Sequence, residues 1–86
     1  MAYKVDITNK ARKQFNALPS VIKPRVSEAI NDLADNPRPH QCIKLEADLG
    51  YRISVGDYRV LYAIDDRAQL VVVYRVKHRR EAYRGN

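Results

Sequence analysis

The stretch GYRISVGDYRVLYAIDD, residues 50–66, consists of two runs of alternating apolar and polar residues on either side of a short turn. Alternation with a period of two is typical of a strand with one buried face, and the Gly56-Asp57 pair between the runs is typical of a two-residue hairpin turn. Such a turn makes Val55 and Tyr58 neighbours and thereby sets the register of both strands. The segment therefore predicts a β-hairpin whose buried face is formed by Tyr51, Ile53, Val55, Tyr58, Val60, Tyr62 and Ile64.

The run QLVVVYRVK, residues 69–77, predicts a third strand that returns beside the second. Matching apolar face to apolar face assigns to the buried side Leu70, Val72, Tyr74 and Val76. Arg75 and Lys77 then lie beside Arg52 and Arg59 on the other side of the sheet. Cations on neighbouring strands repel each other by up to ~1 kcal/mol per pair, and a bound polyanion would relieve that repulsion. Alternatively, the arginine stems only cover apolar residues, and the cations are neutralised at the strand ends by Asp57, Asp65 and Asp66.

The N-terminal residues predict a strand followed by a helix. Residues 2–8 alternate in the manner of a half-buried strand, with Tyr3, Val5 and Ile7 on its apolar side. Residues 9–18 then repeat apolar side chains at helical spacing, and Thr8 or Asn9 is the expected N-cap.

A second helix is expected between Ser20, its candidate N-cap, and the Asn36-Pro37 pair. Its apolar stripe consists of Ile22, Val26, Ile30 and Leu33. Two consecutive helices with apolar stripes need a sheet to cover them. The expected fold class is therefore α+β: a single small domain, residues 1–86, with the order strand, helix, helix and three-stranded antiparallel meander, and with the helical hairpin packed on one face of the sheet.

The composition limits the classes of function. The chain has 16 Lys+Arg against 10 Asp+Glu, a net charge of +6, and residues 51–86 hold 8 cations and 4 acids, which is +4 of that +6. A phosphate backbone is the commonest partner of such a surface, and an acidic protein is the next. So short a chain has no room for a deep cofactor cavity, so we expect no cofactor.

The single cysteine, Cys42, cannot form an internal disulfide, and the sequence has no Cys/His cluster for zinc. A reducing cytoplasm fits this cysteine content, and no metal site is expected. No apolar run approaches the ~20 residues of a membrane span, and the first residues lack the apolar region of a signal peptide. We therefore expect a cytoplasmic protein without a membrane partner.

Three motifs resemble a known family: YRI at 51–53, GDYRVLY at 56–62 and HRREAY at 78–83. With the order of elements, they closely resemble the RelE/ParE superfamily of bacterial toxins over nearly the whole chain. RelE-like members cut messenger RNA in the ribosomal A site, whereas ParE-like members act on DNA gyrase. The resemblance implies the toxin of a type II toxin–antitoxin system, a ribosome-dependent endoribonuclease that inhibits translation. The alternatives are a ParE-like gyrase inhibitor without nuclease activity and a regulatory nucleic-acid-binding module.

The resemblance also implies the partners. These are a RelB-like antitoxin and messenger RNA in the A site of the 30S subunit, with operator DNA bound only through the antitoxin. A protein with a net charge of +6 suits an acidic or amphipathic antitoxin segment that lies along the helices and the basic sheet face.

A ribonuclease without a metal uses the 2′-OH of its substrate as the nucleophile. It needs a base for the 2′-OH proton, an acid for the departing 5′-oxygen and cations over the transition state. By resemblance, Tyr83 is the base, Arg59 stabilises the transition state and a cation of residues 77–80 supports the leaving group. The expected catalytic residues are Tyr83, Arg59, Arg79 and His78, and the expected RNA-binding residues are Arg52, Ser54, Arg75, Lys77, Arg80 and Arg84.

Two of these side chains have a structural alternative. Tyr83 could simply cover the end of the sheet, and His78 either transfers a proton or only hydrogen-bonds phosphate or backbone. The sequence also departs from the family pattern, because Arg52 and Ser54 stand where RelE-like toxins carry two lysines. Arg52 can hold phosphate, but Ser54 supplies no charge. We therefore expect either slower cleavage or a substitute such as Lys77.

Overall fold

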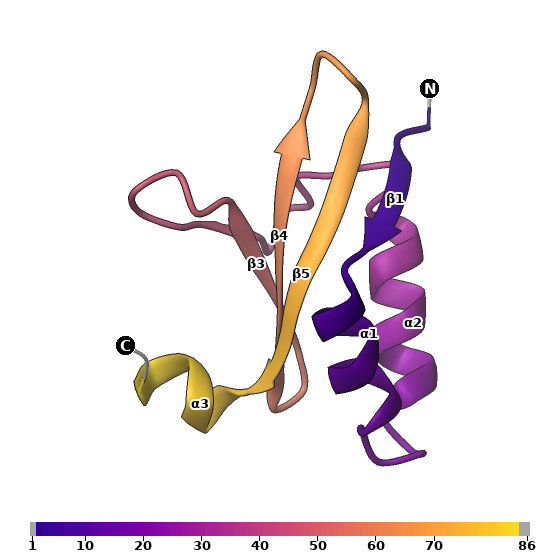
Figure 1. Ribbon diagram of the computed structural model, residues 1–86, viewed down its shortest axis with the longest axis vertical. Helices are drawn as coiled ribbons and strands as arrows, with labels where there is room; N and C mark the ends of the chain where they lie inside the picture. Colours follow the sequence, from indigo (N-terminus) through magenta and orange to yellow (C-terminus); the bar gives the residue numbers. More distant parts are fainter. Residues whose placement is uncertain (1, 85–86) are drawn as a thin grey trace.

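The computed structural model describes residues 2–84, with side chains described through Glu81. Its elements are β1 (Lys4–Ile7), α1 (Asn9–Asn16), α2 (Lys23–Asp32), β2 (Ile43–Lys44), β3 (Tyr51–Val55), β4 (Tyr58–Asp65), β5 (Leu70–His78) and α3 (Arg79–Arg84). The helices α1 and α2 lie on one side of the sheet, and α3 lies at the foot of β5 (Figure 1). This architecture confirms the expected α+β fold class with its strand, helical hairpin and antiparallel meander.

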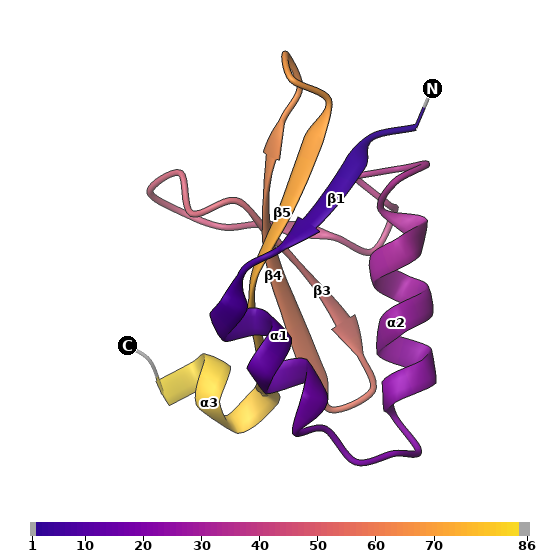
Figure 2. The ribbon, with the colours of Figure 1, turned by 45° about the vertical axis from the view of Figure 1, so that its right-hand side comes forward.

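The five strands form one sheet in the order β1-β5-β4-β3-β2. The first strand, β1, runs parallel to β5, while the other neighbours are antiparallel. In the view of Figure 2, β1 is in front of β5, with which it pairs at the edge of the sheet, and it leads down into α1. The two-residue strand β2 at the opposite edge was not predicted from the sequence, because two residues are too few to display a period.

The β3–β4 hairpin has the predicted register. Val55 is opposite Tyr58, and the ladder continues through Ser54 and Arg59 to Tyr51 and Tyr62. Gly56 in the turn has a φ of 60°, a left-handed conformation that glycine adopts without strain. The predicted buried face is also confirmed, since all seven of its side chains are in the hydrophobic core or packed against it.

The third strand differs from its prediction. Val71 and Val73 are fully buried, and Leu70, Val72 and Tyr74, which alternation assigned to the core, are only partly buried. A β-bulge causes the difference: Arg75 is opposite Leu61, but Val73 is opposite Tyr62, so β5 holds one extra residue. The extra residue reverses the alternation before it and leaves Val76, Arg75 and Lys77 on their predicted faces.

Both helices are shorter than predicted. The Thr8 side chain caps α1 as expected, accepting a 3.2 Å hydrogen bond from the Ala11 amide. Ser20 does not cap α2, whose N-cap is Ile22 without a side-chain bond. The carbonyl of Pro19 accepts instead from the amides of Ile22 and Lys23. The helix ends at Asp32, ahead of the predicted stop at Asn36-Pro37, in a series of turns.

The core lies between the two helices and the sheet. The helices contribute Ala11, Val26 and Ile30, the turns that follow them contribute Leu18 and Leu33, and the sheet contributes Ile53, Val55, Val60, Tyr62, Val71, Val73 and Val76. Burial of each large aliphatic side chain stabilises the fold by ~1.5–3 kcal/mol. Within the described part of the chain, the helices are all too short to cross a membrane.

Candidate functional site

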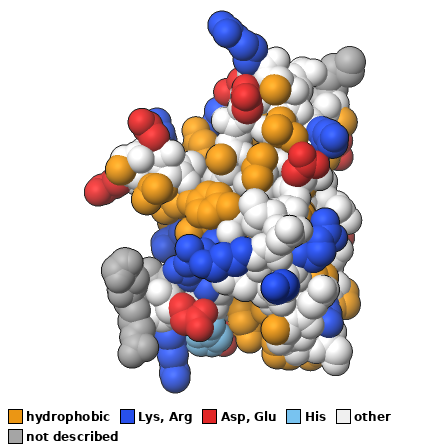
Figure 3. Space-filling view, in the orientation of Figure 1, with side chains coloured by type: hydrophobic (Ala, Val, Ile, Leu, Met, Phe, Trp, Pro, Cys, Tyr) orange, Lys and Arg blue, Asp and Glu red, His pale blue; other side chains and the backbone are white. Residues whose placement is uncertain are grey.

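The side of the sheet that faces away from α1 and α2, here called the outer face, collects positive charge. Ladder pairing puts Arg52, Leu61 and Arg75 in one row across three strands. The adjacent row contains Ser54, Arg59 and Lys77. Figure 3 shows Lys and Arg side chains gathered over the middle of this face. Neighbouring strands are ~4.8 Å apart, so these four cations form one compact group, the cationic cluster of Arg52, Arg59, Arg75 and Lys77.

Two arginines of the cationic cluster have donors without acceptors. The Nε atoms of Arg59 and Arg75 are buried and have no hydrogen-bond partner among the described residues. A buried N–H group without an acceptor is unfavourable by ~1–3 kcal/mol. Arg59 is held from the other end, since its Nη1 donates to the carbonyls of Gly56 at 3.1 Å and Tyr58 at 3.0 Å. Separately from these buried Nε atoms, guanidinium groups on the outer face suit an anionic ligand that supplies oxygen acceptors.

Lys77 has an unusual environment for a lysine. Partial burial lowers its pKa, and the positive charges of Arg75 and Lys10 lower it further, while Glu81 acts in the opposite direction. A lowered pKa means that the ammonium group releases its proton more readily than an exposed lysine does. Lys77 is therefore a cation opposite Arg59 whose protonated form is less favoured than that of an exposed lysine.

The aspartates near the strand ends have other partners. Asp66 forms a two-bond ion pair with Arg38, with oxygen–nitrogen distances of 3.1 and 2.8 Å. Asp65 accepts from the amide of Ala68, and Asp57 lies 3.8 Å from Nε of Arg79. Each of the three aspartates therefore has a partner outside the cationic cluster.

His78 lies on the helix side of the sheet. It is opposite Tyr58, whose ring it meets edge-to-face at a centroid distance of 5.2 Å. Its Nδ1 accepts from the amide of Arg80 at 3.2 Å, and His78 lines a cleft of about 310 Å³ with Gln14, Leu18 and Lys77. The structure thus brings His78 to Lys77, while Arg59 is on the outer face.

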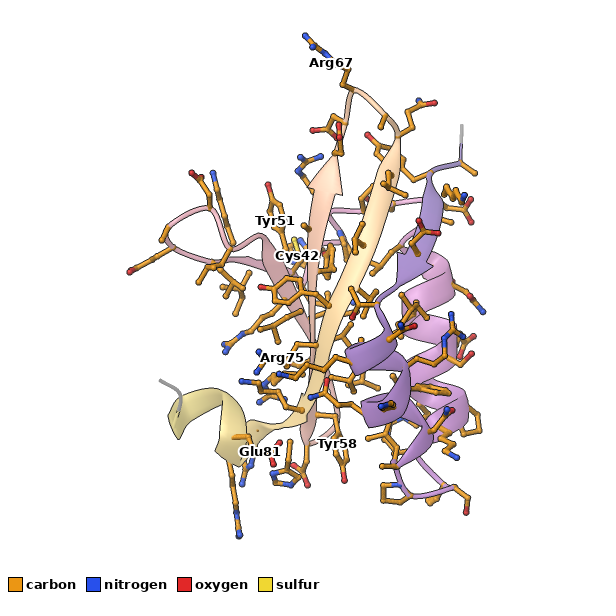
Figure 4. The ribbon with its side chains drawn as sticks, viewed as in Figure 1. Cys42, Tyr51, Tyr58, Arg67, Arg75 and Glu81 are labelled. Carbon is orange, nitrogen blue, oxygen red and sulfur yellow. The ribbon has the colours of Figure 1, made fainter. Side chains whose placement is uncertain are left out.

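Arg79 joins the start of α3 to the hairpin turn. Its amide donates to the carbonyl of Asp57 at 2.7 Å, and its Nε lies 3.8 Å from the Asp57 carboxylate. Figure 4 shows α3 turning away from the sheet below Arg75, with Glu81 near its start. Arg80 is exposed on the same helix. The predicted base Tyr83 and the predicted RNA contact Arg84 are in α3. Only their backbone is described, so the positions of their side chains are not part of this structure.

Sequence reasoning missed an apolar surface beside the cationic cluster. The bulge turns Tyr74 to the outer face next to Arg75, and its hydroxyl donates to the carbonyl of Leu49 at 2.5 Å. Leu49 and Ile43 are exposed large hydrophobic residues, and Ile43 is opposite Arg52 in the sheet. Alternation alone could not find this surface, because the bulge leaves no mark in the order of apolar and polar residues.

The described residues contain no group of three or more His, Cys, Asp or Glu side chains that could hold a metal ion. The charged side chains of the cationic cluster are arginine and lysine, which bind phosphate.

Comparison with known proteins identifies the family. The family model described as the ParE toxin of type II toxin-antitoxin system, parDE, matches residues 5–83. Toxin RelG of Mycobacterium tuberculosis is 38% identical over 86 residues, covering 98% of this chain and 99% of that protein.

Solved structures have the same fold. A chain of the RelBE2 toxin–antitoxin complex from Mycobacterium tuberculosis is 34% identical, with a TM-score of 0.78 over 91% of this chain and 99% of that one. A chain of the archaeal RelE–RelB complex from Pyrococcus horikoshii is 30% identical, with a TM-score of 0.81 over 92% and 97%. This chain therefore belongs to the RelE/ParE superfamily of toxins from type II toxin–antitoxin systems, and within it to the RelE-like proteins.

Proposed function

We propose that this toxin is a ribosome-dependent endoribonuclease that cleaves messenger RNA in the A site. The observation that carries the proposal is the cationic cluster, in which Arg59 is opposite Lys77 and Arg52 and Arg75 occupy the adjacent row. A phosphodiester offers two anionic oxygens to such cations and gains negative charge in the transition state. The 38% identity to Toxin RelG supports a place among the RelE-like toxins.

The proposed reaction transfers a phosphoryl group within the RNA itself. The 2′-oxygen attacks the adjacent phosphorus, and the bond from phosphorus to the 5′-oxygen of the next nucleotide breaks. A base takes the 2′-OH proton, and an acid gives a proton to the departing 5′-oxygen. The products are a 2′,3′-cyclic phosphate and a free 5′-OH, so neither water nor a metal ion enters the balance.

The roles follow from position and charge. Arg59 stabilises the charge on the transition state, because its guanidinium is held against the turn by Gly56 and Tyr58. Arg75 and Arg52 hold the flanking phosphates from the next row. Ser54, in the same row as Arg59, offers a hydroxyl but no charge.

We propose Lys77 as the acid for the leaving group, since it is opposite Arg59 and its lowered pKa favours proton release. Among the other expected contributors, Arg79 holds α3 through Asp57, and His78 lines the helix side. Tyr83 on α3 stays the proposed base, and Arg80 and Arg84 stay proposed RNA contacts.

We further propose a RelB-like antitoxin as the partner of this toxin in the cytoplasm. The solved relatives RelBE2 and archaeal RelE–RelB are complexes of a toxin with an antitoxin. The net charge of +6 and the open outer face suit an acidic or amphipathic segment. Operator DNA would be bound through the antitoxin.

Inhibition of DNA gyrase is the second candidate, because the matching family model is described as a ParE toxin. A gyrase inhibitor needs a binding surface but neither an acid nor a base. The two functions therefore differ in what they require of Lys77 and Tyr83.

The test is single-turnover cleavage of messenger RNA on programmed 70S ribosomes, with mapping of both new ends, beside a gyrase supercoiling assay. We expect cleavage only with ribosomes, a cyclic phosphate end and no effect of chelators. Tyr83→Phe should slow cleavage by about 10²–10⁴-fold with little change in melting temperature. Gyrase inhibition without cleavage would overturn the proposal in favour of the second candidate.

A further inference from the structure

We propose that the ring of Tyr74, with Leu61 and Leu49 beside it, is a platform for a nucleobase next to the phosphate that Arg75 holds. This inference rests on the proposed function, and it makes Tyr74 a specificity-determining residue of the RNA site.

The bulge in β5 creates the platform. In a regular strand, consecutive side chains point to opposite faces, so Tyr74 and Arg75 would be separated by the sheet. Here Arg75 is opposite Leu61 and Val73 is opposite Tyr62, so the extra residue Tyr74 shares the outer face with Arg75. An aromatic ring and a phosphate-binding guanidinium are thus adjacent along one strand.

The ring of Tyr74 is held in place by its hydroxyl. The hydroxyl donates to the carbonyl of Leu49 at 2.5 Å, which ties the ring to the loop before β3. With its polar atom used in this way, Tyr74 offers its apolar ring rather than a hydrogen-bonding group. Leu49, which accepts this bond, is 57% exposed. Figure 3 shows hydrophobic surface directly next to the Lys and Arg patch.

The pattern of side chains favours RNA over a protein segment. Along the row that crosses β2, β3, β4 and β5, apolar and cationic residues alternate as Ile43, Arg52, Leu61 and Arg75. An amphipathic helix needs a continuous apolar stripe, whereas a nucleotide chain presents a base and a phosphate side by side. Aromatic stacking contributes ~1–3 kcal/mol per base, and the guanidinium donors take the phosphate.

The platform should distinguish bases by the size of their ring systems. Tyr74 offers the base no hydrogen-bonding group, so the binding energy at this position depends on how strongly the base stacks and not on the groups along its edges. We therefore expect purines to be bound more tightly than pyrimidines at this one position, with little discrimination between adenine and guanine.

The test uses a short RNA with a 2′-deoxy nucleotide at the bond to be cut, so that it binds but cannot react. One version carries 2-aminopurine beside that bond, and a matched version is abasic there. The parental protein should quench the 2-aminopurine and bind the RNA with the base roughly 5- to 150-fold more tightly than the abasic RNA. This comparison needs no variant, so it does not depend on how a mutant folds.

Two variants then assign the effect to the ring. Tyr74→Phe keeps the ring but loses the bond to Leu49, and it should retain most of the preference for the base. Tyr74→Leu should bind both RNAs equally, with the affinity that the parental protein has for abasic RNA. Melting temperatures report whether either variant is folded.

Equal binding of both RNAs by a parental protein that cleaves on ribosomes would overturn this inference and leave the proposed function standing. Absence of RNA binding and of cleavage would remove both. Full base preference in a folded Tyr74→Leu protein that no longer binds its antitoxin would assign the apolar surface to the protein partner instead.

Discussion

The amide of Val76 donates a 2.8 Å hydrogen bond to Oε1 of Gln14, which joins the edge of β5 to α1. The parallel strand β1 covers β5 only from Leu70 to Val73, so this edge would otherwise end in an unpaired donor. The side chain of Gln14 thus supplies a hydrogen-bond acceptor to β5 beyond the end of β1. This bond is at Val76, between Arg75 and Lys77 of the cationic cluster.

We predict that Gln14→Leu lowers the free energy of unfolding by about 1–3 kcal/mol, because the amide of Val76 loses its acceptor. Gln14→Glu keeps an acceptor oxygen and should be affected less. Urea denaturation of the two variants and the parental protein measures the difference. Equal stability of the Leu variant and the parental protein would mean that water satisfies the amide.

Arg59→Ala should leave the fold intact and slow cleavage by roughly 10²–10³-fold, since the guanidinium is proposed to stabilise the transition state. The matched control is Arg67→Ala, which removes the same charge from the exposed β4–β5 turn at the far end of the sheet (Figure 4). Single-turnover rates on programmed ribosomes distinguish the two. A rate loss of the same size in both variants would point to net charge rather than to the position of Arg59.

The pKa of Lys77 should respond to its neighbours in opposite directions. Arg75→Met removes a positive charge and should raise the pKa of Lys77, whereas Glu81→Gln removes a negative charge and should lower it further. NMR titration of the lysine side-chain signals measures both shifts. If neither variant moved the Lys77 signal, burial alone would control its proton.

Acid should weaken the tie between the 36–42 loop and the β4–β5 turn. Hydrogen bonds from Arg38 and then Tyr3 lower the pKa of Asp66 to about 2. Since an aspartate in an unfolded chain has a pKa of about 3.9, the ionised form stabilises the fold above pH ~4, and this contribution is lost as the pH falls toward 2.

The variant Asp66→Asn should therefore lose less stability than the parental protein between pH 4 and pH 2 in thermal melting. The difference should shrink in high salt, because the side chains of the ion pair are 44% and 55% exposed. Identical pH profiles of the two proteins would show that the ion pair does not contribute to stability.

Local pattern was sufficient for the hairpin and insufficient for β5. A two-residue turn leaves one register for β3 and β4, so the pairing of Ser54 with Arg59 follows from the sequence alone. The bulge at Tyr74 depends on how β5 meets β4, which no property of the individual residues reveals. The cap at Ser20 failed for a related reason, because the carbonyl of Pro19 had already accepted the amides that a cap would serve.

The candidate site was predictable to the same extent. The positions of the cationic cluster could be predicted, because the sequence shows which residues are charged and the hairpin turn sets the strand register. The contacts of His78 with the ring of Tyr58 and of Arg79 with the carboxylate of Asp57 were not predicted. Such contacts arise between segments distant in sequence, so composition does not anticipate them.

The parallel pairing of β1 with β5 also affects how the protein is made. Because β5 is the central partner of both β1 and β4, a nascent chain cannot close its sheet until residues 70–78 have left the ribosome. Until then, the apolar stripes of α1 and α2 have only the β3–β4 hairpin to cover them, and Arg59 lacks its neighbour Lys77. The cationic cluster of Arg52, Arg59, Arg75 and Lys77 is therefore complete only after β5 has been synthesised and has paired with β4.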